Sequence, residues 1–172
     1  MKHGLIYGAN GYTGRLIALQ AKRVGLQPIL AGRSFDIQRI GAETGLPVRQ
    51  FDLADSHATA SALSDVQLVL NCAGPFSATC TPMLDACLQY KVHYLDITGE
   101  IDVFAHCHAQ HARAQAAGIV VLPGAGFDVV PTDCLAAQLK RELPGATHLT
   151  LAFEGGGGFS PGTAKSSVEG LG

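Results

Sequence analysis

The sequence predicts an α/β fold in which helices cover both faces of a doubly wound parallel sheet. Short apolar runs alternate along the chain with longer segments of helical periodicity. Hydrophobic residues make up 47% of the 172 positions but aromatic residues only 6%, so the apolar side chains are mainly aliphatic, as in strands buried on both faces. A glycine-rich turn also joins the first expected strand directly to the first expected helix.

Six apolar runs have the length of buried strands. They cover residues 5–8, 28–31, 48–51, 66–70, 92–95 and 119–122. Parallel strands need crossover connections, and these connections are right-handed. We therefore expect two βαβαβ halves and the strand order 3-2-1-4-5-6.

Six segments with helical spacing alternate with these strands and follow the last one. They cover residues 12–23, 35–44, 56–63, 81–90, 102–117 and 131–142. In the first of them, Leu16, Leu19 and Val24 share one side. Ser56 is the expected N-cap of the third, and Pro82 lies in the first turn of the fourth, where proline is tolerated.

The pattern changes after Pro144 and Gly145. Residues 148–153 alternate between apolar and polar side chains, which predicts a strand with one solvated face. We interpret residues 1–145 as one domain and residues 146–172 as the start of a second, α+β domain that is incomplete. A truncated chain is the expected reason, and a natural tail is the alternative.

Charge and cysteine content argue against several classes of protein. The chain has 12 Lys and Arg against 14 Asp and Glu, so no basic excess indicates binding to nucleic acid. We find no signal-peptide pattern and no apolar run of membrane-spanning length. The five cysteines are odd in number and form no Cys-x-x-Cys pair, which favours reduced thiols in a cytoplasmic protein.

The turn after the first strand carries the strongest functional signal. Its glycines have the spacing Gly-x-x-Gly-x-x-Gly between a strand and a helix, a variant of the dinucleotide-binding fingerprint. Gly8 permits a sharp turn, Gly11 lets a pyrophosphate approach the backbone, and Gly14 lets the helix lie close to the sheet. The helix N-terminus adds unpaired N–H groups and partial positive charge. The expected cofactor-binding residues here are Gly8, Ala9, Asn10, Gly11, Tyr12, Thr13 and Gly14.

The end of the second strand indicates which dinucleotide is bound. NAD enzymes usually place an acidic residue there, which binds the ribose hydroxyls. In this chain Arg33 and Ser34 occupy the position, and a guanidinium can bind a 2′-phosphate that a carboxylate would repel. We therefore expect both residues to bind cofactor, with NADP(H) preferred and NAD(H) as the alternative. Asp36 is close, but it falls in the first turn of the next helix, where an acid favours the helix dipole.

The fourth strand leads into a loop that we expect to pass the adenosine and ribose, because ligands of such sheets lie at the carboxyl ends of the strands. The expected cofactor contacts in this loop are Asn71, Ala73, Gly74 and Pro75. Cys72 lies among them, but nothing in the sequence supplies the base that a nucleophilic cysteine needs.

Acidic residues follow the fifth and sixth strands, on the side where a nicotinamide would lie. Asp96, Glu100 and Asp128 are therefore the candidate catalytic acids, bases or substrate-binding groups. Helix capping and loop hydrogen bonding are the alternative roles for each of them.

A histidine-rich helix offers a weaker signal. His106, Cys107, His108 and His111 lie close together in the sequence, and Cys107 and His111 share a helix face. A metal site there is conceivable, but no second ligand pair of similar spacing exists elsewhere. We interpret these residues as a solvated helix face and expect no bound metal.

These motifs resemble, in order, those of the saccharopine dehydrogenase-like oxidoreductases, a group that includes the trans-acting enoyl reductases of lipid synthesis. The matching segments are residues 8–14, 30–33, 71–76, 94–100, 124–128 and 156–165. The resemblance implies an N-terminal NAD(P)-binding domain with a Rossmann fold. It also implies a C-terminal domain for substrate binding and dimerisation, and hence a homodimer.

Two functions fit these observations. The first is hydride transfer between NADP(H) and a small-molecule substrate with a C=N, C=C or C=O bond. A short-chain dehydrogenase is disfavoured, because no tyrosine is followed four positions later by lysine. The second is a non-catalytic, NADP(H)-sensing regulatory protein with the same fold. We expect residues 1–172 to bind cofactor without turning over a substrate.

Overall fold

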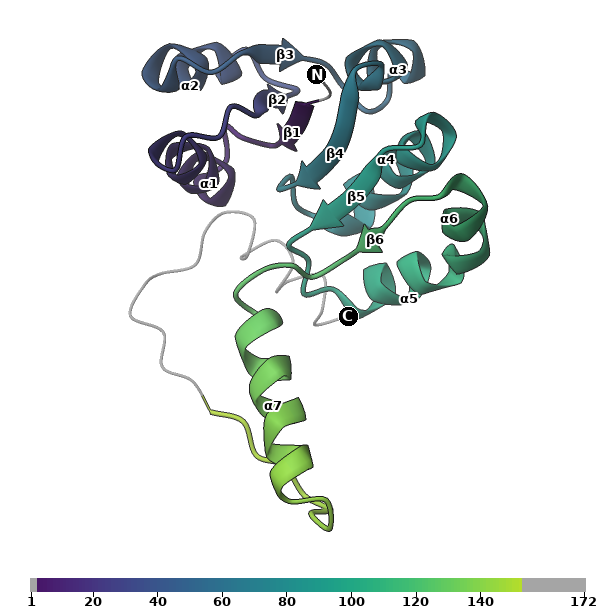
Figure 1. Cartoon of the computed structure of the whole chain (residues 1–172). Helices are drawn as coiled ribbons and strands as arrows, with labels where there is room; N and C mark the ends of the chain where they lie inside the picture. Colours follow the sequence, from purple (N-terminus) through teal and green to yellow (C-terminus); the bar gives the residue numbers. More distant parts are fainter. Residues whose placement is uncertain (1–2, 153–172) are drawn as a thin grey trace.

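A six-stranded parallel sheet forms the centre of the computed structural model, which describes residues 3–152 (Figure 1). Its strands are β1 (His3–Tyr7), β2 (Ile29–Gly32), β3 (Val48–Gln50), β4 (Val66–Asn71), β5 (His93–Asp96) and β6 (Val121–Leu122). Their spatial order is β3-β2-β1-β4-β5-β6, and every neighbouring pair is parallel. This order confirms the prediction of a doubly wound sheet.

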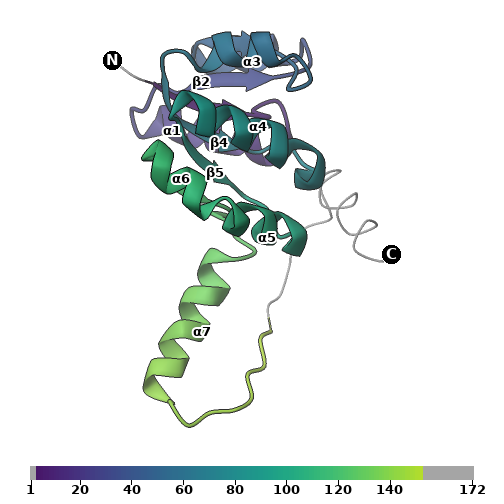
Figure 2. The same ribbon diagram turned by 90° about the vertical axis from the view of Figure 1, so that its right-hand side faces the viewer.

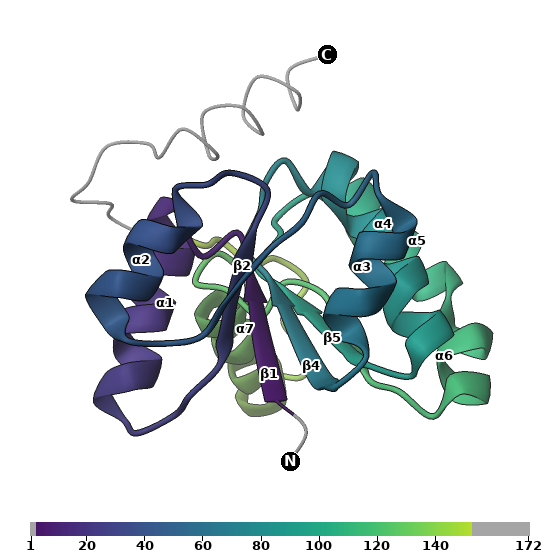
Figure 3. The ribbon, with the colours of Figure 1, turned by 90° about the horizontal axis from the view of Figure 1, so that it is seen from above.

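Helices cover both faces of the sheet. They are α1 (Tyr12–Arg23), α2 (Ile37–Thr44), α3 (Ser56–Leu63), α4 (Phe76–Tyr90), α5 (Ile101–Ala109), α6 (His111–Ala117) and α7 (Val130–Glu142). Figure 3 shows α1 and α2 on one side of the strands and α3 to α6 on the other. The helix contacts follow the same division, since α1 touches α2 while α4 touches α3, α5 and α6.

The side chains of β1 alternate between two buried clusters. Leu5 and Tyr7 join the cluster that contains α3 and α4, and Ile6 joins the one that contains α1 and α2. Ile6 pairs with Leu30 on β2 and with Leu70 on β4. Both faces of the central strand are thus covered, which explains its continuous apolar run.

The buried face of α1 is not the apolar side seen in the sequence. Leu16 is 47% exposed, and Val24, just past the helix, is 58% exposed. The buried residues are Gly14, Ala18 and Ala21, whose spacing places them on one face. These small residues let α1 lie close to the sheet. They take the place of Leu16, Leu19 and Val24, the larger apolar residues expected to face it.

Two helix starts correct the sequence-based prediction. Asp55, not Ser56, caps α3, and its carboxylate accepts a hydrogen bond from Ala58 N at 2.9 Å. Because Ser56 already belongs to the helix, its hydroxyl cannot serve as the cap. α4 begins at Phe76, so Pro82 lies inside that helix instead of in its first turn. The reason for this early start lies in a distant residue, described below.

The long helix expected over residues 102–117 is two helices that meet at Gln110. Gln110 leaves the helical backbone conformation (φ −84°, ψ 5°) and caps both helices. Its side-chain oxygen accepts a hydrogen bond from Arg113 at 2.7 Å, and its carbonyl accepts one from Ala114 N at 2.9 Å. The bond from Ala114 N is the first backbone bond of α6.

The last described helix, α7, is exposed. No residue of α7 is buried, and Figure 2 shows this helix projecting away from the sheet and its covering helices. The strand expected over residues 148–153 is not formed at 148–152, and Phe153 lies outside the described residues. A lone strand needs a hydrogen-bonded neighbour, and no described strand pairs with this segment. Within residues 3–152, no helix combines the length and the apolar character needed to cross a bilayer.

Candidate dinucleotide-binding site

The predicted glycine loop lies at the carboxyl end of β1, between β2 and β4. Gly8 has a left-handed backbone conformation (φ 80°), which glycine adopts without steric cost. Its N–H and that of Ala9 both donate to Ala31 O on β2, at 2.8 and 3.1 Å. On the other side, Cys72 N donates to Tyr7 O at 2.8 Å. The loop is therefore anchored beside both neighbouring strands.

Close backbone contacts explain why Gly8 and Gly14 lack side chains. A Cβ on Gly8 would lie 2.7 Å from Ala73 N. A Cβ on Gly14 would overlap Gly8 O and would lie 2.8 Å from Ala9 Cα. Backbone atoms cannot move aside as a flexible side chain can. Gly11 is less constrained, because a Cβ there would meet Gly8 O at 3.2 Å, so its role beside a pyrophosphate stays a prediction.

The N-terminus of α1 opens toward this loop with unpaired amide groups. Gly11 is the N-cap, no side chain caps the helix, and the first turn contains no acidic residue. Arg15 N makes the first bond of the helix, to Gly11 O at 2.9 Å. The N–H groups of Tyr12, Thr13 and Gly14 precede it and so have no acceptor within the helix. This arrangement offers amides and partial positive charge to an anion.

Asn10 packs across the end of β2. A Cβ on Gly32 would lie 2.6 Å from Asn10 Oδ1, so the missing side chain leaves the space that Asn10 occupies. This contact holds the glycine loop against β2. Sequence reasoning assigned no role to Gly32. The available signal was a glycine at the last position of a buried strand, which often marks a close approach.

Arg33 and Ser34 are exposed in the loop between β2 and α2. Gln50 Nε2 donates to Arg33 O at 3.1 Å and fixes the backbone there. The Ser34 hydroxyl donates to Asp36 Oδ2 at 2.9 Å and accepts from Asp36 N at 3.1 Å. Asp36 is the N-cap residue of α2, but its side chain makes no capping bond. The place predicted for a 2′-phosphate thus contains a cation and, beside it, a carboxylate bound to serine.

Tyr7 is the last residue of β1, and its hydroxyl donates a hydrogen bond to Phe51 O at 3.3 Å. Burial raises the pKa of Tyr7, and the charge of Asp52 raises it further. Arg33 lowers this pKa by a smaller contribution. The tyrosine therefore stays neutral at physiological pH and acts as a packing and hydrogen-bonding group.

Asn71 shapes the loop that follows β4. It is fully buried, its Oδ1 accepts from Ala73 N at 3.1 Å, and its Nδ2 donates to Thr79 Oγ1 at 3.1 Å. These bonds fix the turn through Gly74 and Pro75, and Pro75 is the N-cap of α4. Asn71 thus holds the loop internally, whereas Ala73 borders the glycine turn at Gly8.

Cys72 has the surroundings of an inert thiol. Burial raises its pKa to about 12, and the charge of Asp96 raises it as well. A thiol with a raised pKa is protonated at neutral pH and is a poor nucleophile. The structure therefore supplies no activation for this cysteine.

Glu100 closes the N-terminus of α4. Its carboxylate accepts hydrogen bonds from Phe76 N at 3.0 Å and from Ser77 N at 2.7 Å. Pro75 cannot cap the helix with its own side chain, so an acid from the start of α5 does so. This long-range cap explains why α4 begins earlier than the sequence predicts. It gives Glu100 the alternative role of helix capping.

The other two acidic candidates have different surroundings. Asp96 is fully buried, and its Oδ1 accepts from Thr98 N at 3.0 Å and Gly124 N at 2.8 Å. Asp128 is exposed, and its Oδ2 lies 3.8 Å from the position that a Cβ on Gly99 would take. Asp96 and Glu100 are thus engaged in internal bonds, and of the three only Asp128 is exposed.

A cavity of about 440 Å³ has none of these acidic residues in its lining. Phe104, Cys107, His108, His111 and Pro123 are among the residues that line it, together with parts of α6 and β6. None of its lining residues was predicted to bind cofactor or to act in catalysis. The candidate dinucleotide site is instead an open surface across the strand ends.

The histidine-rich segment does not form the ligand set considered from the sequence. His106 Nε2 lies 3.4 Å from Thr81 Oγ1 on α4, whereas His108 and His111 line the cavity. Within the described part of the chain, these histidines join no group of three potential metal ligands.

Comparison with known proteins points to one family. The sequence profile of a family described as the saccharopine dehydrogenase NADP binding domain matches residues 5–122, from β1 to β6. A saccharopine dehydrogenase-like oxidoreductase from Homo sapiens is 25% identical over 199 residues, which cover 99% of this chain and 46% of that protein. A trans-acting enoyl reductase from Mycobacterium leprae (strain TN) is 30% identical over 148 residues, which cover 81% of this chain and 35% of that protein. The chain thus spans less than half the length of these relatives.

A solved structure agrees on the fold. Apo saccharopine dehydrogenase (L-Glu forming) from Saccharomyces cerevisiae matches with a TM-score of 0.68 at 16% identity, over 84% of this chain and 32% of that chain. At this identity the likeness concerns the architecture alone.

Proposed function

The chain belongs to the saccharopine dehydrogenase NADP-binding domain family, and from this premise we propose that it binds NADP(H) across the carboxyl ends of β1, β2 and β4 for hydride transfer. The observation that carries the proposal is the N-terminus of α1, which has no side-chain cap and begins within the glycine loop of residues 8–14. It provides the unpaired amides that a pyrophosphate requires. In this arrangement the adenosine and ribose lie along the loop of residues 71–75.

Arg33 supplies a physical reason for NADP(H) over NAD(H). It is exposed at the end of β2 and forms no ion pair with any residue between 3 and 152, so its guanidinium is available to a 2′-phosphate. Ser34 adds a hydroxyl, whose single proton is donated to Asp36 in this structure and would have to turn to a phosphate oxygen when the cofactor binds. The nearby carboxylate opposes phosphate binding only modestly, because exposed charges are screened by solvent and salt.

Substitution of Arg33 tests this assignment. Arg33→Ala should weaken NADPH binding by about 1.5–3 kcal/mol, the contribution of a charged hydrogen bond, and leave NADH binding nearly unchanged. Isothermal titration calorimetry with both cofactors measures the difference, and Arg39→Ala, an exposed arginine on α2, is the matched control. Equal losses for NADPH and NADH would contradict the assignment. No heat and no melting shift with any nicotinamide or flavin dinucleotide would overturn the proposed function altogether.

The reaction that we propose is reduction or oxidation of a small molecule at a C=N, C=C or C=O bond. NADP(H) supplies the hydride when bound, and the protein orients it. Asp128 is the acid that we assign to proton transfer or substrate binding, because it is exposed at the edge where β5 and β6 end.

We further propose that residues 146–172 begin a second domain that completes the substrate site and forms a homodimer. A cytoplasmic location is supported by five cysteines without a disulfide partner.

A non-catalytic NADP(H) sensor is the second candidate, and one observation favours it. Two of the three acidic candidates, Asp96 and Glu100, are held by internal hydrogen bonds. Cofactor oxidation by the full-length protein with a panel of imines, ketones and enoyl esters separates the two functions. Turnover of any panel member supports the enzyme, and tight cofactor binding without turnover supports the sensor.

A further inference from the structure

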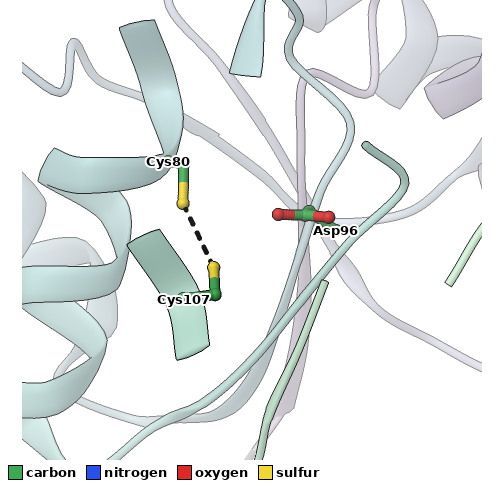
Figure 4. A group of neighbouring side chains, drawn as sticks. All are labelled: Cys80, Asp96 and Cys107. Carbon is green, nitrogen blue, oxygen red and sulfur yellow. Dashed lines mark hydrogen bonds between the residues drawn. The ribbon is translucent and has the colours of Figure 1, made fainter. Parts of the chain in front are cut away.

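Three potential metal ligands meet in the buried space between α4, β5 and α5. The sulfur atoms of Cys80 and Cys107 lie 3.6 Å apart, and a carboxylate oxygen of Asp96 completes a group whose ligand atoms all lie within 4.8 Å of one another. Figure 4 shows the two thiols facing each other with the carboxylate beside them. Cys80, Cys107 and Asp96 are 2%, 4% and 0% exposed, so the group is largely shielded from bulk water.

The Asp96 carboxylate is fully buried and forms no ion pair with any residue among residues 3–152. Its Oδ1 accepts hydrogen bonds from Thr98 N and Gly124 N, and its Oδ2 accepts one from the Tyr94 hydroxyl at 2.7 Å. Oδ2 therefore keeps acceptor capacity. Buried charges in proteins are normally paired or bound to a metal. The two thiols beside this carboxylate are the groups that would let it hold a cation.

The spacing of the two sulfurs fits a shared cation better than a disulfide. Two thiolates on one tetrahedral Zn²⁺, each at about 2.3 Å, are about 3.8 Å apart. The observed separation is 3.6 Å, at which the protonated thiols share a hydrogen bond, whereas a disulfide needs about 2.05 Å. The hydrogen bonds from Thr98 N and Gly124 N also orient the carboxylate, as partners outside the ligand set do in metal sites.

We propose that Cys80, Asp96 and Cys107 form a structural site for a thiophilic divalent cation of the Zn²⁺ class. On binding, both thiols release their protons to solvent, and the cation offsets most of the charge of two thiolates and a carboxylate. The fourth position falls to water or to the Tyr94 hydroxyl. The cation would join α4, β5 and α5 at one point and would fix Asp96, which holds the loop at Gly124.

A neighbouring cavity offers a route to this site. Cys107 lines the cavity of about 440 Å³ whose wall includes His108 and His111. That cavity provides a route of approach, with imidazole groups that can bind a cation transiently.

The test uses the whole 172-residue chain, reduced and stripped with a chelator. We expect it to bind one equivalent of Zn²⁺ in competition with a chromogenic chelator, and to give a thiolate-to-metal absorption band with Co²⁺. Cys80→Ala and Cys107→Ala should each weaken Zn²⁺ binding by about 100-fold or more, since even loss of a supporting residue costs 10–100-fold. Cys87→Ala is the matched control, because Cys87 is a buried thiol on α4 outside the group. It should bind Zn²⁺ as the unaltered chain does.

A second readout guards against a variant that fails to fold. In the unaltered chain, Zn²⁺ should slow alkylation of Cys80 and Cys107, but not of the exposed Cys134, as resolved by peptide mass spectrometry. Absence of the Co²⁺ band, or equal alkylation rates with and without Zn²⁺, would overturn the proposal. So would a Cys87→Ala variant that loses as much affinity as Cys80→Ala, or a chain that forms a Cys80–Cys107 disulfide in air and binds no Zn²⁺ after reduction.

Discussion

The helices α1 and α4 begin at the same edge of the sheet, but their first amide groups differ in hydrogen bonding. α1 follows β1 and has neither a capping side chain nor an acid in its first turn. α4 follows β4, and its first amides bind the Glu100 carboxylate. Both ends carry the partial positive charge of a helix N-terminus. One is left for an anion from outside, and the other is filled by the protein's own anion.

This difference shows how two similar halves of one sheet can differ in their capacity to bind an anion. The two halves of a doubly wound sheet each place a helix N-terminus beside the central strands. Of this pair of helices, α4 has its first amides bound by Glu100, and α1 has no side-chain cap. The predictions below alter one helix end at a time, and they run from the largest expected effect to the smallest.

Gly14→Val should disrupt the open helix end most severely. Its Cβ would overlap Gly8 O, so α1 must move away from the glycine loop. Overpacking of this kind costs about 1–3 kcal/mol of stability, and we expect NADPH titration to give no signal. Gly4→Ala is the control, because a Cβ on Gly4 meets nothing within 4 Å. A Gly14→Val protein that binds NADPH normally would show that the close approach is unnecessary.

Glu100→Ala should empty the filled helix end. We expect the free energy of unfolding to fall by about 1.5–3 kcal/mol, because the two amides lose a charged acceptor. Urea denaturation measures this change. NADPH affinity should change little, because α1 is untouched. Asp102→Ala, which removes a neighbouring exposed acid from the first turn of α5, should cost less than Glu100→Ala. Equal costs would mean that Glu100 does not stabilise α4 specifically.

Gly11→Asp should give α1 a carboxylate of its own and make it resemble α4. We expect NADPH binding to weaken by about tenfold or more, since an aspartate at the N-cap competes with the pyrophosphate. Stability should change by only about 0.5 kcal/mol, because glycine is already a tolerable N-cap. Gly11→Ala adds the same Cβ without the charge. If both variants lose NADPH binding equally, crowding and not charge is responsible.

Asp36→Asn should have the smallest effect. The amide oxygen can still accept from the Ser34 hydroxyl, but the negative charge beside Arg33 is gone. We expect NADPH to bind more tightly by about 0.5 kcal/mol at low ionic strength, with the gain fading as salt is added. Calorimetric titration at two salt concentrations measures it. NADPH binding that weakens would indicate that Asp36 contacts the cofactor directly.

The sheet could be predicted from the sequence because its signals are local. Alternating apolar runs and the turn at Gly8 identify the strands and their order, and these features depend on neighbours in the chain. The start of α4 could not be predicted, because its cap comes from Glu100, 24 residues after Phe76. A cap from a distant residue leaves no local pattern around Pro75.

The candidate site also has parts that the sequence predicts and parts that depend on the fold. The loop of residues 8–14 was identified from spacing, but its contact between Asn10 and Gly32 depends on how β1 and β2 pair. The burial of Asp96 also depends on the fold, because its partner Gly124 lies 28 residues away. For α1, the pattern of large apolar residues suggested the wrong buried face. Small residues such as Ala18 are weakly hydrophobic, and only close packing reveals their role.

The exposure of α7 has a consequence for local unfolding of this helix. A helix of 13 residues without one buried side chain relies on its own backbone bonds, and such helices are marginal in water. Its amides should therefore exchange with deuterium in seconds to minutes while those of β1 and β4 stay protected. A protease that cuts near residue 128 would separate α7 from the six-stranded sheet. The sheet and the glycine loop of residues 8–14 should stay folded.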